Sequence, residues 1–485
     1  MRRSGTVATL RFRMADQRSF AQLSGDFNPV HLDPIVARRI AAGEPIVHGV
    51  HLLLRALDRH FRTAPAPPRL ALSATFLSPA LLNEPISVTR SAGNGVVRLA
   101  IDCGVRLVDA SISALAQAAP AANPAAGRAR RPANRRGSQT PKVLTPSDVG
   151  DATGVLDLAP AASVRRAFPR AAHALGSDAV AAIVAMSRLV GMECPGRDSL
   201  LSALRFDLTP HARAKQLAWS VARADRRFGL IRMKICAAGL SGTVDAFLRP
   251  SVPAAPSIAA VGARVAAGEF AGQRALVIGG SRGLGATAAM LLCSGGGTPL
   301  ITYATGRRDA EMLRRDARAA GFPLEIARFD VLGDPVERIA GAAARFGATH
   351  IYYFATPRIF VRRQDPFDAA LFRRFADFYV SGFARLCAAV RSVTPALDVF
   401  YPSTTAIDEG GVRELTEYAA AKAAGEALCR TLSASTPGLR ILVRRLPRVT
   451  TDQAATILPA RSLDPVEALL PVIREMHRRA GEGDR

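Results

Sequence analysis

A carboxylate and an imidazole lie close together near the start of this 485-residue chain, in the string Ser-Gly-Asp-Phe-Asn-Pro-Val-His. Asp26 and His31 are separated by five positions across a bend at Pro29, so both side chains can face one pocket. Such a pair can take a proton from water and deliver another to carbon, the transfers needed for adding or removing water. An Asp-x-Asn-Pro segment alone is commonly a turn, so the prediction depends on the residues beyond it.

The dipeptide His48-Gly49 comes after this string and leads into an apolar stretch, residues 50–61, whose pattern predicts a helix. The N–H of Gly49 would lie at the N-terminus of that helix, where backbone N–H groups and the helix dipole attract negative charge. A carbonyl oxygen can be polarised there without any side chain. His31, His48 and His51 do not have the spacing of zinc ligands, and no metal site is expected.

A second set of reactive side chains lies in the last part of the chain. Tyr418 and Lys422 are four residues apart, so they share one face of a helix. Upstream, a predicted strand over Arg274–Ile278 runs directly into a glycine-rich loop. Glycines in such a loop let the backbone approach a pyrophosphate at a helix N-terminus. The loop consists of Gly279, Gly280, Ser281, Arg282, Gly283, Leu284 and Gly285.

The first set resembles the active-site segment of the MaoC-type (R)-specific enoyl-thioester hydratases, which have the hotdog fold. The resemblance depends on the Asp-x-Asn-Pro-x-His string, the following His-Gly pair and the helix beyond it. It implies that Asp26 and His31 hold and activate the water. It also implies that Asn28 orients this pair at the substrate site, and that the N–H of Gly49 binds the thioester oxygen.

The second set resembles the short-chain dehydrogenases/reductases. The resemblance implies that Tyr418 protonates the carbonyl oxygen, that Lys422 lowers the pKa of Tyr418 and holds the ribose, and that Ser403 donates a hydrogen bond to that oxygen. The implied cofactor-binding residues are Gly279, Ser281, Arg282, Gly283, Leu284, Gly285, Asp330, Val331, Thr356, Tyr418 and Lys422.

The predicted cofactor is NADP(H). After the second predicted strand, Tyr303-Ala304-Thr305 lacks the acidic residue that would bind a ribose 2′-hydroxyl. Arg282, Arg307 and Arg308 are near enough in sequence to meet a 2′-phosphate instead.

Several positions depart from the short-chain reductase pattern. Thr356 stands in the stretch where the family has Asn-Asn-Ala-Gly, and Tyr379 takes the position of the helix asparagine. Arg448 follows Pro447 where glycine is usual, Ile278 replaces a threonine, and Ser403 is slightly farther from Tyr418 than expected. These changes leave cofactor binding possible but bring the proton relay behind Lys422 into question.

The elements that must position the first set form two similar blocks. Residues 1–115 are predicted to be a hotdog domain, with the helix at 50–61 followed by strands at 70–77, 85–91, 96–103 and 105–115. Residues 148–252 repeat this order without the acid/base string, with a helix at 179–190 and strands at 203–208, 217–224, 229–237 and 242–248. They are predicted to be a second, catalytically silent hotdog that pairs with the first.

Between the blocks, residues 116–147 contain no acidic residue and are rich in Ala, Pro and Arg, which predicts a disordered basic linker. Residues 265–485 alternate strands with helices, with strands at 274–278, 299–303, 324–329, 348–354, 398–401 and 439–444. This alternation predicts a doubly wound parallel sheet. The expected fold class is therefore an α+β double hotdog followed by an α/β doubly wound Rossmann domain.

Composition limits the other classes of function. A net charge of +24 suggests nucleic acid as a partner, but only four of the 64 basic residues are lysines and the arginines are spread along an Ala-rich chain. Six cysteines occur without a Cys-x-x-Cys pair, and no run of apolar residues approaches the length of a membrane span. We expect a cytoplasmic homo-oligomer with no nucleic-acid or membrane partner.

Together these features predict a bifunctional enzyme acting on an acyl-CoA or acyl-carrier-protein thioester. It would combine NADPH-dependent 3-oxoacyl reduction with (R)-3-hydroxyacyl dehydration or enoyl hydration, in fatty-acyl or polyketide-like biosynthesis. A β-oxidation-type hydratase and 3-hydroxyacyl dehydrogenase would use the same residues, because a catalyst accelerates both directions. A third alternative is an acyl-binding protein whose Rossmann domain senses NADP(H) without catalysis.

Overall fold

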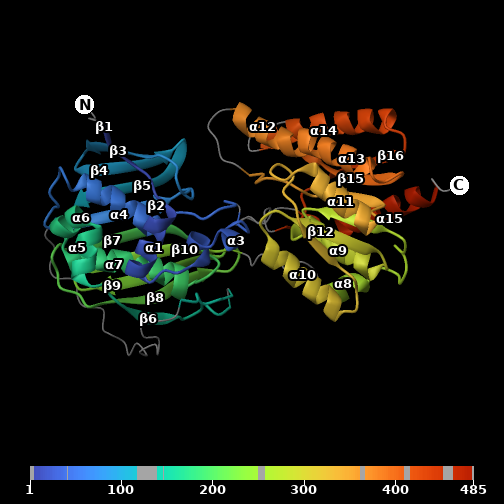
Figure 1. Ribbon diagram of the computed structural model, residues 1–485. Coiled ribbons are helices and arrows are strands. Elements are labelled where there is room, and N and C mark those ends of the chain that lie inside the picture. Colours follow the sequence, from blue (N-terminus) through green and yellow to red (C-terminus); the bar gives the residue numbers. More distant parts are fainter. Residues whose placement is uncertain are drawn as a thin grey trace. The chain divides into compact units, whose positions relative to one another are not determined.

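The computed structural model describes residues 5–40, 42–116, 139–145, 147–249, 257–360, 366–408, 415–451 and 462–482. They form two compact units, unit 1 up to residue 249 and unit 2 from residue 257 (Figure 1). Most of the predicted linker, residues 117–138 and 146, lies outside the described residues. Its last part is ordered against unit 1, because the N–H of Lys142 donates to the carbonyl of Met192 and the N–H of Arg197 to that of Lys142.

Within the described residues, unit 1 is built on one antiparallel sheet of ten strands in the order β1-β3-β4-β5-β2-β7-β10-β9-β8-β6. The strands are β1 (Gly5–Leu10), β2 (Leu70–Phe76), β3 (Ile86–Gly93), β4 (Val96–Cys103), β5 (Val105–Ala114), β6 (Thr153–Asp157), β7 (Ser199–Leu208), β8 (Gln216–Asp225), β9 (Leu230–Ala237) and β10 (Leu240–Leu248). Read outward from the centre, the two halves have the same strand order. They join where β2 pairs with β7, with Leu70 opposite Leu208 and Thr75 opposite Ala203.

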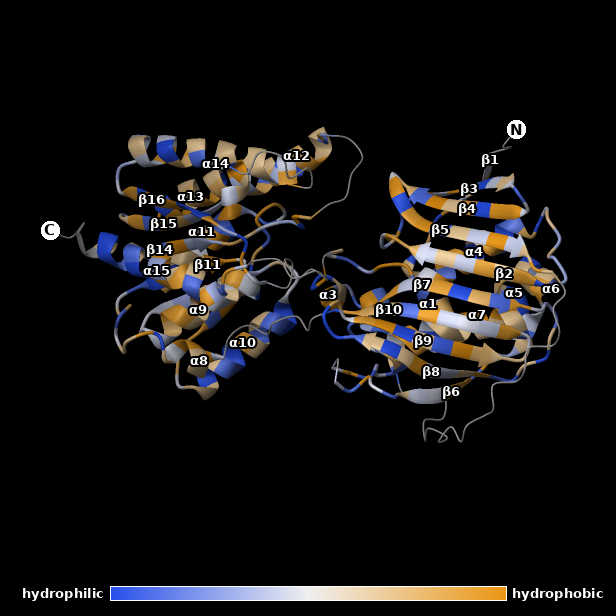
Figure 2. Cartoon of the chain, turned by 180° about the vertical axis from the view of Figure 1, so that it is seen from behind, coloured by the Kyte–Doolittle hydropathy of each residue, from blue (hydrophilic) through white to orange (hydrophobic). Residues whose placement is uncertain are grey.

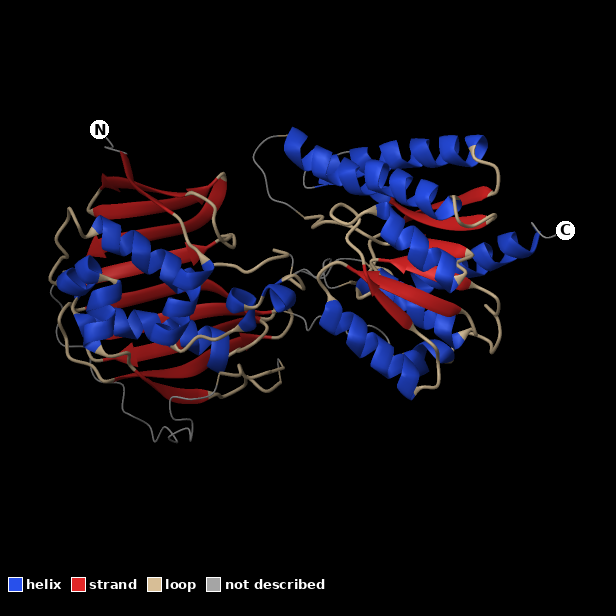
Figure 3. Ribbon diagram, in the orientation of Figure 1, coloured by secondary structure: helices blue, strands red, loops and turns tan. Residues whose placement is uncertain are grey.

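The helices of unit 1 lie against one face of this sheet (Figure 3). They are α1 (Met14–Ser24), α2 (Pro29–Leu32), α3 (Pro34–Ala37), α4 (Gly49–His60), α5 (Ala161–Ala167), α6 (Pro169–Leu175), α7 (Ser177–Arg188) and the π-helix η1 (Leu189–Glu193). From behind, the strands are seen without helices over them, and hydrophilic and hydrophobic residues alternate along them (Figure 2). That alternation follows from the period of two in a strand with one buried face.

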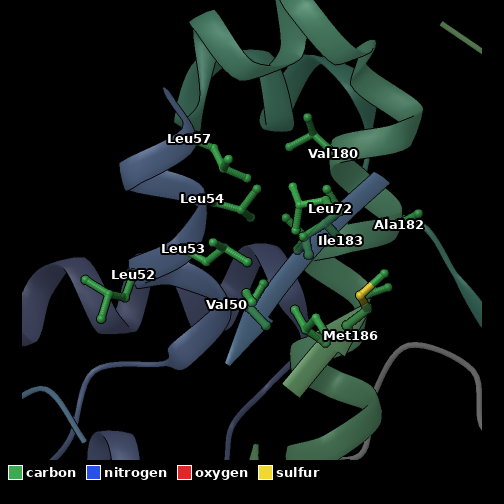
Figure 4. Packing of buried hydrophobic residues seen from close by; sticks show 14 of the residues in the cluster. Val50, Leu52, Leu53, Leu54, Leu57, Leu72, Val180, Ala182, Ile183 and Met186 are labelled. Carbon is green, nitrogen blue, oxygen red and sulfur yellow. The ribbon is translucent and has the colours of Figure 1, made fainter. Parts of the chain in front are cut away.

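Helices α4 and α7 hold the core of unit 1 together. Val50, Leu54 and Leu57 of α4 recur at helical spacing and point toward Val180 and Ile183 of α7 (Figure 4). All five side chains are buried. Burying side chains of this size contributes roughly 1.5–3 kcal/mol each relative to leaving them exposed. The two halves therefore share one core.

No single helix in the described part of the chain is both long and apolar enough to cross a membrane. Two consecutive helical segments, α6 and the continuous α7 and η1, are long and apolar enough only when taken together, and they are bent by 118° where they meet.

Unit 2 contains a parallel sheet in the order β13-β12-β11-β14-β15-β16, counted over the described residues. Its strands are β11 (Arg274–Ile278), β12 (Thr298–Tyr303), β13 (Glu325–Arg328), β14 (His350–Tyr353), β15 (Leu397–Thr404) and β16 (Leu439–Leu446). The helical segments are α8 (Ile258–Gly262), α9 (Gly283–Ser294), α10 (Arg307–Ala319), α11 (Val336–Phe346), α12 (Ala369–Ala376), η2 (Asp377–Gly382), α13 (Phe383–Arg391), η3 (Thr405–Ile407), α14 (Thr416–Ser435) and α15 (Pro465–Glu482).

Two separate apolar clusters cover the two faces of this sheet. One contains residues of α9 and α15, and the other contains residues of α11, α13 and α14. The strand order reverses between β11 and β14, and the crevice beyond the strand ends at such a reversal is where ligands bind in open α/β sheets. The predicted doubly wound sheet is confirmed.

The main errors of the sequence-based prediction in unit 1 are at its edges. The predicted strands at 70–77, 96–103 and 105–115 agree closely with β2, β4 and β5. The outermost strands β1 and β6 and the short helices α1, α5 and α6 were not predicted. Edge strands bury little, and most of β1 is exposed or half-buried, so its sequence carries only a weak periodic signal.

Candidate functional site

The acid/base segment of unit 1 follows the end of α1. Gly25 adopts a left-handed conformation with φ of 75° and terminates the helix, which turns Asp26 inward until only 2% of it is exposed. The carboxylate of Asp26 accepts hydrogen bonds from Ser187 Oγ at 2.7 Å and from the N–H of Asn28 at 3.2 Å. Asp26 is therefore buried, fixed and hydrogen-bonded on both oxygens.

Two histidines complete this cluster. The rings of His31 and His48 stack with centroids 3.8 Å apart, and single ligand atoms of Asp26, His31 and His48 all lie within 4.8 Å of one another. His31 Nδ1 lies 2.8 Å from the carbonyl of Ile46, and His48 Nδ1 lies 2.8 Å from Gln17 Oε1. His48 Nε2 is 3.9 Å from Asp26 Oδ2. The sequence indicated the first two residues as a pair, but not the direct contact with the His48 ring.

Burial shifts the two proton affinities toward each other. Desolvation raises the pKa of Asp26, although His31, Ser187 and other neighbours oppose this. Desolvation lowers the pKa of His31, although Asp26 opposes it. The pKa values of the carboxyl group and the imidazole thus shift in opposite directions, and each shift favours the neutral form of its group.

Asn28 was predicted to bind substrate, and the structure shows its carboxamide engaged with the protein. Its Nδ2 donates to the carbonyls of Gly191 at 3.0 Å and Arg197 at 3.1 Å. Its Oδ1 accepts from the N–H of Val30 at 3.2 Å and so caps α2. Asn28 therefore orients the acid/base segment by joining it to the second half of unit 1.

The second half of unit 1 lacks the acid/base string, but it supplies part of the site. Ser187, at the end of α7, is the hydroxyl that holds Asp26. A Cβ atom on Gly191, in the π-helix η1, would collide with the Asp26 carboxylate, so glycine is required there. No signal in the sequence links either residue to a segment more than 150 positions away.

Gly49 is the first residue of α4, as predicted. The N–H groups of the first turn of a helix have no partner within the helix, so this one can donate to a ligand. A Cβ atom at this position would lie only 3.0 Å from the ring of Phe76. Close packing therefore gives a second reason for glycine.

In unit 2, the glycine-rich loop connects β11 to α9 as predicted. Gly279 has a φ of 76°, and its N–H donates to Thr302 Oγ1 at 3.1 Å. A Cβ atom on Gly285 would collide with the carbonyl of Gly279, so the loop can fold this tightly only with glycine. Gly283 begins α9, which places free N–H groups of the first helical turn beside the loop. These residues fit a pyrophosphate.

The other predicted cofactor residues differ in burial and in their hydrogen-bond partners. Asp330 Oδ1 accepts from the N–H of Leu332 at 3.1 Å, and Val331 is buried. Arg307 is paired with Glu311 at 2.7 Å on the surface. Arg282 is the N-cap residue of α9, directly after Ser281 and before Gly283 and Leu284.

Ser403, predicted to donate to the carbonyl oxygen of a substrate, has a partner within the protein. Ser403 Oγ donates to Glu426 Oε1 at 2.5 Å, and Glu426 is held in turn by Arg445. The side chain hydrogen-bonded to Tyr418 is that of Thr404, the next residue along β15. Successive side chains of a strand point to opposite faces, so a shift of one residue decides which hydroxyl meets Tyr418.

Burial dominates the pKa values of the Tyr-x-x-x-Lys pair. It raises the pKa of Tyr418 to about 12 and lowers the pKa of Lys422 to about 7. Lys422 Nζ donates to the carbonyl of Pro402 at 2.6 Å and lies 3.9 Å from the ring centroid of Tyr379. Tyr379 also bonds Thr356, with their oxygens 2.5 Å apart. The two departures from the reductase pattern thus contact each other, and Tyr379 covers the lysine.

Comparison with known proteins gives a family for the start of the chain. Residues 2–95 match the model of the MaoC like domain. The (R)-specific enoyl-CoA hydratase of Aeromonas caviae is 55% identical over 42 residues, which are 9% of this chain and 31% of that protein. The peroxisomal hydratase-dehydrogenase-epimerase of Saccharomyces cerevisiae is 43% identical over 49 residues, which are 10% of this chain and 5% of that protein. The matches thus span less than a third of either relative.

Among solved structures, a short chain dehydrogenase from Burkholderia cenocepacia in complex with NADP is similar at 20% identity. The alignment covers 43% of this chain and 91% of that one, with a TM-score of 0.38. The predicted MaoC-like start is confirmed. It is followed by a unit with the doubly wound topology expected for a short-chain dehydrogenase.

Proposed function

We propose that unit 1 adds water to an enoyl thioester, or removes it from a 3-hydroxyacyl thioester, and that unit 2 reduces 3-oxoacyl thioesters with NADPH. The observation that carries this proposal is the cluster of buried Asp26 and His48 with half-buried His31, beside the N-terminus of α4. We infer a double hotdog, residues 1–115 and 148–252, followed by a short-chain reductase domain, residues 265–485. The matched strand order of the two halves supports this division.

In hydration, the oxygen of water forms a bond to the β-carbon while the π electrons move toward the thioester carbonyl. The pair of Asp26 and His31 takes one proton from the water and delivers one to the α-carbon. The negative charge that develops on the thioester oxygen is met by the N–H of Gly49 and the positive end of the α4 dipole. Dehydration is the same path reversed.

In reduction, the nicotinamide cofactor, when bound, supplies the hydride to the carbonyl carbon. Tyr418 gives its hydroxyl proton to the carbonyl oxygen, and Thr404 hydrogen-bonds Tyr418. The preference for NADPH depends on Arg282 and on the absence of an acidic residue after β12. A biosynthetic role and a cytoplasmic homo-oligomer remain part of the proposal.

The test is to incubate the full-length protein with crotonyl-CoA alone, and with acetoacetyl-CoA plus NADPH or NADH. Loss of the enoyl absorbance and oxidation of the nicotinamide are followed separately. We expect turnover in both assays, with NADPH preferred. If crotonyl-CoA is left unchanged at every pH tried, the hydratase assignment fails.

A second candidate for unit 2 is a non-catalytic NADP(H) sensor. The specific observation in its favour is that the ammonium of Lys422 is bound to Pro402 and covered by Tyr379. Binding of NADPH measured by nicotinamide fluorescence, with no oxidation by any 3-oxoacyl thioester, would favour the sensor over the reductase.

A further inference from the structure

Residues 139–145, the last part of the predicted linker, lie along residues 190–197 in the second half of unit 1, and we call them the strap. The N–H and the carbonyl of Lys142 are both hydrogen-bonded to that stretch, at 3.0 and 2.8 Å. A Cβ atom on Gly196 would collide with the carbonyl oxygen of Lys142, so glycine is required for this close approach. The strap is therefore packed into unit 1 by specific backbone contacts.

The stretch that the strap contacts also holds the acid/base segment. Asn28 Nδ2 donates to the carbonyls of Gly191 and Arg197 at 3.0 and 3.1 Å. The backbone of Gly191 lies so close to the Asp26 carboxylate that a Cβ atom would collide with it. A displacement of residues 190–197 would therefore be felt directly at Asp26.

A chain of ion pairs connects the strap to the backbone that precedes Asp26. Lys142 Nζ lies 2.9 Å from Glu193 Oε2, and Glu193 Oε1 accepts from Arg188 Nη2 at 3.2 Å. Arg188 is the last residue of α7, and its side chain lies against Gly25, since a Cβ atom there would be 3.2 Å from Arg188 Cδ and Nη1. Each oxygen of Glu193 thus faces one cation, and one of these cations packs against the residue before Asp26.

The inner part of this chain is shielded from solvent. The side chain of Glu193 is only 9% exposed and that of Arg188 only 16%. Charges in such positions are screened much less than surface charges. A buried carboxylate is tolerated when both of its oxygens are paired, as they are here.

The charge of Arg188 acts on Asp26. The other titratable groups that face Asp26 in the described structure are His31 on α2 and His48 before α4. Desolvation raises the pKa of Asp26, whereas His31 and, to a smaller extent, Arg188 lower it. Because Glu193 balances the charge of Arg188, it limits how far Arg188 can lower the pKa of Asp26.

We propose that Glu193 is a positioning residue of the acid/base site, which holds Arg188 against Gly25 and is itself held by Lys142 of the strap. Glu193 contacts no reacting atom, and it acts on Asp26 through the place and the charge of Arg188. The strap is thereby part of the acid/base site. The consequence for catalysis depends on the proposed hydratase function of unit 1.

The first test is the pH profile of crotonyl-CoA hydration, on the side where the rate falls because Asp26 becomes protonated. Glu193→Gln keeps the shape of the side chain but leaves Arg188 uncompensated, so this limb should move to lower pH by about one unit. Lys142→Met leaves the negative charge of Glu193 less balanced, so the limb should move to higher pH. That second shift should be smaller, because the Lys142 side chain is 45% exposed and its charge is screened.

The matched control is Lys215→Met, which removes an exposed lysine of the same unit and should leave the limb in place. A purely structural role for the ion pairs predicts lower rates in Glu193→Gln and Lys142→Met without shifts of opposite sign. Limbs that do not move in opposite directions in these two variants overturn the inference, while crotonyl-CoA hydration itself can still stand.

The second test needs no enzyme activity. The unfolding temperature of the full-length protein is measured with and without Asp26→Asn, in the wild-type and Glu193→Gln backgrounds, from about pH 4 to pH 8. The advantage of Asp26→Asn grows with pH until Asp26 is fully ionised in the folded protein, so this growth should end at a lower pH in the Glu193→Gln background. An unchanged end point overturns the inference. If the wild type hydrates no enoyl thioester, the proposed function fails, and this comparison alone decides on Glu193.

Discussion

The two reactive clusters of this chain are both buried, yet burial has opposite consequences for them. In unit 1 it raises the pKa of Asp26 and lowers that of His31, so the two pKa values shift toward each other. In unit 2 it raises the pKa of Tyr418 to about 12 and lowers that of Lys422 to about 7, so these two pKa values move apart. Burial alone therefore does not make a catalytic pair. The chemical types of the partners decide the outcome.

The clusters also differ in how their polar atoms are satisfied. Ser187 and the N–H of Asn28 bind Asp26 without covering His31, which stays half-buried. In unit 2, the ammonium of Lys422 is bonded to the carbonyl of Pro402. The carboxylate of Asp26 is thus fixed through both oxygens, whereas Lys422 uses one of its three N–H donors on the backbone.

The largest expected effect is on hydration. Asp26→Asn or His31→Ala should lower the rate with crotonyl-CoA by at least about a hundredfold, because a positioned general acid or base is lost. His173→Ala, on α6 in the second half, is a control that leaves the acid/base pair intact. The assay is loss of the enoyl absorbance. Near wild-type rates in both Asp26→Asn and His31→Ala would show that the Asp26 and His31 pair of unit 1 is not the general acid or base of hydration.

In unit 2, Tyr418→Phe should abolish NADPH oxidation by acetoacetyl-CoA and leave crotonyl-CoA hydration intact, because the two sites lie in separate units with separate cores. Each variant is assayed for both reactions. Loss of hydration in the same variant would mean that the two clusters are not independent.

The neighbouring hydroxyls give a sharper version of that test. Thr404→Val should lower the rate of 3-oxoacyl reduction by roughly tenfold or more. The Thr404 hydroxyl is hydrogen-bonded to Tyr418, the proposed proton donor, and valine would remove that bond. Ser403→Ala should have a smaller effect on the rate, since Ser403 bonds Glu426 instead. The comparison uses kcat for the two variants in parallel. A larger loss of kcat from Ser403→Ala than from Thr404→Val would support the role predicted from the sequence, in which Ser403 donates to the carbonyl oxygen of the substrate.

The smallest expected effect is on stability. Because burial raises the pKa of Asp26 above its unfolded value, its contribution is favourable at low pH and is lost as pH rises through the folded pKa. Asp26→Asn should therefore unfold a few degrees higher than wild type at pH 7 to 8, with the difference shrinking below about pH 4. Thermal unfolding of the full-length protein over that pH range measures it. A variant less stable than wild type at pH 7 would show that the carboxylate is net stabilising.

Local patterns in the sequence predicted much of this molecule. The helix at α4, the glycine loop and most strands follow from periodicity and from residues such as Gly279 that tolerate few alternatives. The contacts of Ser187 and Gly191 with Asp26 could not be predicted, because they depend on how two distant segments pack. The hydrogen bonds of Thr404 to Tyr418 and of Ser403 to Glu426 could not be predicted either, since they depend on a one-residue register within β15.

The pairing of β2 with β7 has a consequence for how the Asp26 site responds to dilution. If the two halves were separate subunits, Ser187 would reach Asp26 only in a dimer, and activity per molecule would fall at low concentration. Here both halves belong to one chain, so each meets the other at a high effective concentration set by the connecting segment. The contacts of Ser187 and Gly191 with Asp26 therefore do not depend on the concentration of the protein.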